Sequence, residues 1–81
     1  MNDLKSGYSH PLYFTAGMQV YVRETATSAR RAIVVEARGD SALVELQPSK
    51  AERLVFLDDC AVPDDVRTAQ LRASALAGAR M

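Results

Sequence analysis

Residues 31–46 constrain the fold of this chain more than any other segment. Two apolar runs rich in β-branched side chains lie on either side of the dipeptide Gly39-Asp40. Two such runs separated by a Gly-Asp step are a strong signal for a β-hairpin. The sequence therefore predicts a tight hairpin, with strands at 32–38 and 41–47, at the centre of a small β-structure.

A further strand is expected at residues 17–23, where apolar and polar side chains alternate. The inward positions are Met18, Val20 and Val22, and the outward positions are Gln19, Tyr21 and Arg23. The polar segment 24–30 then predicts a connection of about seven residues, which is longer than a tight hairpin turn. A loop of this length on a small scaffold often carries function.

The second half of the chain predicts one more strand at 53–57, whose four successive apolar residues indicate burial on both faces, as in a tightly curled barrel. Residues 58–62 are expected to form a single 3₁₀ turn and a short fifth strand. A helix is expected over 64–77, because acidic residues favour its positive end and the segment is rich in Ala, Leu, Arg and Gln.

The length of 81 residues allows one small domain. We expect an N-terminal leader at 1–14, a small β-barrel at 15–63, and a C-terminal helix and tail at 64–81. The formal net charge of zero provides no overall field that would attract nucleic acid or an anionic membrane. No window approaches the roughly 20 apolar residues of a membrane helix. Cys60 is the only cysteine, which excludes an intrachain disulfide and favours a cytoplasmic location.

The reactive residue types do not converge on a catalytic or metal-binding motif. His10 and Cys60 supply at most two soft metal ligands, fewer than a zinc site needs. The acidic pairs Asp58-Asp59 and Asp64-Asp65 are expected at a turn and at a helix start, where capping and solvation explain them. We therefore expect Cys60 to be a buried structural residue, and the chain to have no cofactor and no metal.

The most informative polar cluster is rich in arginine. Its members are Tyr21, Arg23, Arg30, Arg31 and Arg38. Arginine binds phosphates and base edges well, and an outward tyrosine can stack on a base. The alternative is that these arginines are solvated and paired across strands with Glu24, Glu36 and Glu45.

Two apolar groups are candidate surfaces for a protein partner. One is the aromatic pair Tyr13 and Phe14 of the leader, whose alternative role is to clip the leader onto the domain. The other is a thin stripe on the expected helix, formed by Val66, Ala69, Ala73 and Leu76.

The strand pattern resembles the small Src-homology-3-like barrels, in their KOW and Tudor-like branches. The resemblance covers about residues 15–62 and is carried by Gly17-Met18-Gln19-Val20-Tyr21-Val22, Ile33-Val34-Val35-Glu36, Gly39-Asp40 and Ala42-Leu43-Val44-Glu45. It implies a mainly β fold: a five-stranded barrel with an appended C-terminal α-helix. Barrels of this class mostly bind nucleic acid or protein, and fold alone does not decide between these partners.

The resemblance also bears on catalysis. The plasmid-borne type II dihydrofolate reductases look similar in strand layout and carry a Val-Gln-Ile-Tyr motif near the fourth strand. This chain reads Leu54-Val55-Phe56-Leu57 there, without the Gln and the Tyr. We therefore expect a non-enzymatic binding or adaptor module of bacterial or mobile-element origin. It contacts nucleic acid through the arginine-rich face or, alternatively, associates with protein partners or with itself as a homodimer.

Overall fold

The computed structural model describes residues 7–79 and is mainly β, with six antiparallel strands in one sheet and one C-terminal helix. The first six residues of the expected leader and the last two of the expected tail lie outside this range. The elements are β1 (Tyr8–Ser9), β2 (Gln19–Thr25), β3 (Ser28–Arg38), β4 (Ser41–Leu46), β5 (Glu52–Phe56), the 3₁₀ turn η2 (Leu57–Asp59), β6 (Cys60–Pro63) and α1 (Asp64–Ala79).

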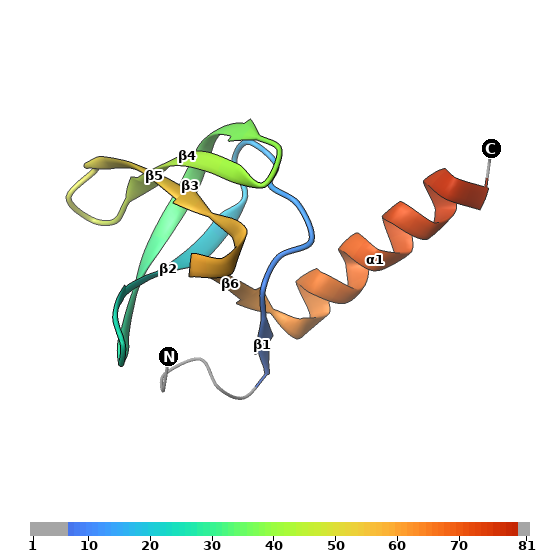
Figure 1. Ribbon diagram of the computed structural model, residues 1–81, viewed down its shortest axis with the longest axis horizontal. Helices are drawn as coiled ribbons and strands as arrows, with labels where there is room; N and C mark the ends of the chain where they lie inside the picture. The colour runs from blue at the N-terminus through green and yellow to red at the C-terminus, as the bar shows by residue number, and fades with distance from the viewer. Residues whose placement is uncertain (1–6, 80–81) are drawn as a thin grey trace.

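The strands follow the order β1-β6-β2-β3-β4-β5, so that β1 and β5 form the two edges of an open sheet. Figure 1 shows the strands curling around one side while α1 extends away from the sheet. The expected 3₁₀ turn, short last strand and C-terminal helix are confirmed, and the helix is two residues longer than the predicted end at 77.

The core lies on the concave face of this sheet. The alternation in β2 is confirmed, because Val20 and Val22 are each 1% exposed and Met18 packs against them. The remaining core side chains come from the leader and the other long strands: Phe14, Ala32, Val34, Ala42, Val44, Leu46, Val55, Cys60 and Val62. Most are small or β-branched, which suits the short distances inside a curled sheet.

The central hairpin is confirmed, with β3 and β4 joined by Gly39 and Asp40. Gly39 has a φ of +74°, the region that the first central position of a type II′ hairpin turn requires. The pairing shifts by one residue between Val34 and Glu36. Val34 is buried, and Val35 on the opposite face is 44% exposed; after the bulge, Glu36 lies on the same side as Leu43.

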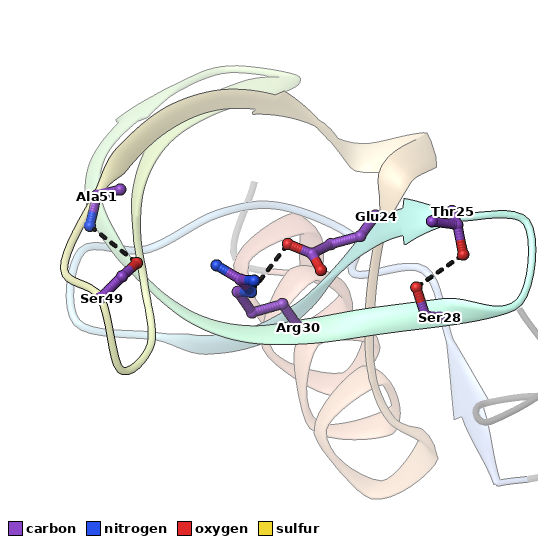
Figure 2. Close-up of polar contacts among 6 residues, drawn as sticks. All are labelled: Glu24, Thr25, Ser28, Arg30, Ser49 and Ala51. Carbon is purple, nitrogen blue, oxygen red and sulfur yellow. Dashed lines mark hydrogen bonds and ion pairs between the residues drawn. The ribbon is translucent and has the colours of Figure 1, made fainter.

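The prediction of a long connection at residues 24–30 is wrong. Strands β2 and β3 continue through it and are joined by only two residues, Ala26 and Thr27, with Thr25 registered against Ser28. The Thr25 and Ser28 hydroxyls form a hydrogen bond of 2.7 Å across the turn, drawn in Figure 2. The segment is polar because it is a solvated β-ribbon, and threonine has a high strand propensity.

The prediction that the strand at 53–57 is buried on both faces is also wrong. In β5, Val55 is buried, whereas Leu54 and Phe56 are 48% and 52% exposed. The reason is position, because β5 is an edge strand and only one of its faces covers the core. Ala51 N–H donates to the Ser49 hydroxyl in the preceding turn at 3.4 Å (Figure 2).

The leader packs on the domain. Strand β1 pairs with β6, and Phe14 is 6% exposed within the core. The amide of Gln70, itself 7% exposed, accepts a hydrogen bond from Leu12 N–H and donates one to the Tyr13 carbonyl. These contacts fix the leader against the first turns of α1. Within residues 7–79, no helix is long and apolar enough to cross a membrane.

Candidate nucleic-acid interface

Three of the five residues predicted to contact nucleic acid lie together on the convex face. Tyr21 of β2 is registered against Arg31 of β3, and Arg23 is registered against Ala29 two positions along. Residues two apart on a strand share a face, so Tyr21, Arg23 and Arg31 point to the same side. Both arginines are exposed and Tyr21 is half-buried. We call these three residues the basic face.

A second tyrosine extends this face and was missed by sequence reasoning. The ring of Tyr8 meets the ring of Tyr21 edge to face, with centroids 5.7 Å apart and planes at 88°. This is a favourable geometry for two aromatic rings. The contact depends on β1 pairing with β6 and on β6 pairing with β2. No local pattern in the sequence signals it, because Tyr8 and Tyr21 come together only through β6.

Arg30 lies on the other face and is engaged in an ion pair. Its Nε lies 2.8 Å from Glu24 Oε1, and Figure 2 shows the two side chains turned toward one another from neighbouring strands. Arg30 is registered against Val22, a core residue, so it points to the concave side at the end of the hairpin. The alternative interpretation, a cross-strand pair with a glutamate, therefore describes Arg30 correctly.

Arg38 is remote from the basic face. It lies seven residues beyond Arg31 along β3, roughly 23 Å at the rise of a strand. Its Nε is 2.5 Å from Glu36 Oε2. The five predicted residues therefore do not form one cluster, because the hairpin places its two arginine-bearing ends far apart.

The charged side chains on the convex face change sign across the sheet. Glu45 of β4 is registered against Glu52 of β5 and faces the same side as Ile33. Glu45 also accepts a hydrogen bond from the side-chain amide of Gln47 at 3.0 Å, and no ion pair joins it to an arginine within residues 7–79. Arginines thus line the β2–β3 side and carboxylates line the β4–β5 side, so a polyanion would be confined to the first.

The apolar surfaces predicted for a protein partner are only partly exposed. Phe14 is in the core, so the leader contributes Tyr13 alone, at 38% exposed. On α1, Val66 packs against the core, whereas Ala69, Ala73 and Leu76 are exposed. The interpretation of Phe14 as a clip is confirmed, and its use as a contact surface is wrong.

Cys60 is a buried structural residue, as expected, with 0% exposure. Burial, together with the smaller effect of the Asp59 carboxylate, raises the pKa of its thiol to about 12. Its backbone carbonyl accepts a hydrogen bond from Nδ1 of His10 at 2.7 Å. Because a carbonyl can only accept, Nδ1 carries the proton in this contact.

The described residues bring together no metal site. No group of three or more His, Cys, Asp or Glu side chains within 7–79 lies close enough to hold a metal ion. Comparisons with protein-family models, with curated proteins and with solved structures find no match for this chain.

Proposed function

We propose that this chain is a non-enzymatic binding module that contacts single-stranded nucleic acid through the basic face. The observation that carries the proposal is the registration of Tyr21 against Arg31, with Arg23 on the same side of the sheet. An aromatic ring beside free guanidinium groups is the arrangement that stacks a base while binding its phosphates.

The proposed preference for single-stranded nucleic acid follows from the Tyr21 ring of the basic face. The bases of a duplex are stacked on one another, whereas an unpaired base is free to stack on a side chain. Tyr8 supports Tyr21 from the side and restricts its ring orientation. Neither Arg23 nor Arg31 has an ion-pair partner in the described part of the chain, so their guanidinium groups are available to phosphate.

The proposed fold is an open variant of the Src-homology-3-like barrel. The tight β3–β4 hairpin and the 3₁₀ turn before β6 support it, since both belong to the strand pattern that resembles those barrels. The long early loop of the expected pattern is replaced by the β2–β3 hairpin, and the sheet is open.

The test is fluorescence anisotropy with a labelled single-stranded oligonucleotide at two salt concentrations. The double variant Arg23→Gln/Arg31→Gln is expected to weaken binding at least about tenfold and to reduce the salt slope by about 1.4, since each phosphate contact on a single strand contributes about 0.7. The matched control is Arg38→Gln/Arg53→Gln, which removes the same charge from exposed positions away from the basic face. It is expected to bind like the parent protein.

Two results would overturn this proposal. One is the absence of salt-dependent binding by the parent protein at low salt. The other is equal weakening in the two double variants, which would mean that only net charge matters. The first result would favour the second candidate function, association with protein, for which the exposed Leu54 and Phe56 are the specific observation.

A further inference from the structure

We propose that the free edge of β5 pairs with β5 of a second copy of this chain, forming an antiparallel homodimer about a two-fold axis at Leu54. The proposal goes beyond nucleic-acid binding and does not depend on it. It rests on the hydrogen bonds that β5 leaves open, on its exposed apolar side chains, and on the charges at its two ends.

The backbone contacts of β5 show which groups are open. Leu46 N–H donates to the Ala51 carbonyl, and Leu57 N–H donates to the Asp40 carbonyl. Hydrogen-bonded positions alternate along an antiparallel strand, so Arg53 and Val55 also direct their backbone groups to β4. The backbone groups of Glu52, Leu54 and Phe56 therefore point to the outer edge. Within residues 7–79, β5 pairs with β4 alone.

A second β5 fits these open groups when Leu54 lies opposite its own copy. Glu52 of each chain then lies opposite Phe56 of the other, and Leu54 opposite Leu54. In such a pair, each residue donates one hydrogen bond from its backbone N–H and accepts one at its backbone carbonyl. All open groups of the three residues in both copies are thereby satisfied.

The side chains on this edge favour association. Leu54 and Phe56 are 48% and 52% exposed on the convex face. In this pairing each Leu54 contacts the Leu54 of the other copy. Each Phe56 lies diagonal to that same leucine, at a distance that an aromatic side chain can span. Natural edge strands are usually protected by charged side chains, above all lysine, by proline or by a bulge. In β5 the charged residues are confined to its start at Glu52 and Arg53, and none of these features occurs between Leu54 and Phe56.

The charges that flank β5 are self-complementary in the same register. Lys50 lies four residues before Leu54, and Asp58 lies four residues after it. Lys50 and Asp58 lie just beyond the two ends of β5, so a two-fold axis at Leu54 places the Lys50 end of one copy beside the Asp58 end of the other. Both side chains are exposed. A parallel pairing would instead place Lys50 beside Lys50, so the flanking charges select the antiparallel dimer.

The two-fold axis of such a dimer runs perpendicular to the sheet, so both convex faces lie on the same side. The basic faces of the two copies would then lie on one side of a continuous sheet, separated by the β4 and β5 strands of both copies.

The test is sedimentation velocity of the full chain between about 1 μM and 1 mM, a range that covers weak and moderate dimers. We expect a concentration-dependent dimer in the parent protein. Leu54→Lys places two ammonium groups at the axis and should raise the dissociation constant at least about tenfold. Leu71→Lys on α1 is the matched control, because Leu71 is also 48% exposed; its dissociation constant should be unchanged.

A charge reversal tests the register. Lys50→Glu should weaken the dimer by about threefold or more, because each glutamate would face the Asp58 carboxylate of the other copy, and adding Asp58→Lys should restore it. Failure of the second change to restore the dimer contradicts the register. A monomer throughout the concentration range overturns the proposal, as does a dimer that Leu71→Lys disrupts and Leu54→Lys leaves intact.

Discussion

The side-chain carbonyl of Gln70 accepts a hydrogen bond of 2.7 Å from the backbone N–H of Leu12, which lies 58 positions earlier in the chain. The amide nitrogen of the same side chain donates to the Tyr13 carbonyl at 2.9 Å. One buried amide thus satisfies two backbone groups of the leader where it crosses α1, and so determines how the leader enters the core at Phe14.

Removing this amide is expected to destabilise the protein. Gln70→Ala leaves Leu12 N–H and the Tyr13 carbonyl without their partner, which costs about 1–3 kcal/mol for a buried group. The measurement is urea unfolding, together with hydrogen exchange of the Leu12 amide, which should become faster. Thr68→Ala, an exposed change on the same helix, should leave both unchanged. Equal stability of Gln70→Ala and the parent protein would show that the contact contributes nothing.

The alternation of side chains along β3 predicts opposite outcomes for two adjacent valines. Val34→Ala should cost about 2 kcal/mol because it leaves a cavity in the core, whereas Val35→Ala should cost less than about 0.5 kcal/mol. The exposed fractions of the two side chains are 1% and 44%. Thermal or urea unfolding of both variants gives the comparison, and similar losses in the two would contradict the assignment of these two side chains to opposite faces of β3.

The sequence predicted well those elements whose signals are local. The Gly39-Asp40 turn joins two apolar runs, and the acidic start of α1 precedes a run of good helix formers, so neighbouring residues are sufficient to define both. A 3₁₀ turn was also predicted within 58–62, and it lies at Leu57–Asp59.

The errors came from features that depend on distant partners. Four apolar residues in succession indicated a strand buried on both faces, but α1 packs against β6 and β1 instead of covering the convex face of β5. The grouping of Arg38 with Arg31 failed because β3 is eleven residues long and carries them toward opposite ends. Tyr8 was missed for the same reason, since β6 brings it to Tyr21.

The backbone conformation of Gly39 gives a second matched pair of variants. Gly39→Ala forces a φ of +74° on a residue with a Cβ, which costs about 1–2 kcal/mol. Gly78→Ala in α1 should instead stabilise the helix by about 0.5–1 kcal/mol. Neither new Cβ would meet another atom within 4 Å, so the difference isolates the backbone. Unfolding midpoints that shift in the same direction would contradict this assignment.

The buried thiol of Cys60 predicts how stability depends on alkaline pH. Its pKa is raised to about 12 in the folded protein, against about 8.5 in an unfolded chain. Above pH 8.5 the unfolded state loses this proton while the folded state keeps it, so the free energy of unfolding falls as pH rises. The slope from this group approaches about 1.4 kcal/mol per pH unit and ends once the folded thiol also ionises.

Urea unfolding of the parent protein and of Cys60→Ala at pH 7.5 and pH 10 separates this contribution from the titration of tyrosine and lysine. Those groups are common to both proteins, so the parent should lose about 1–2 kcal/mol more than the variant between the two pH values. At neutral pH the thiol should also react with an alkylating reagent only after unfolding, because the thiolate is the nucleophile. An equal loss in both proteins, or rapid alkylation of the folded chain, would mean that Cys60 is not held in its protonated, buried form.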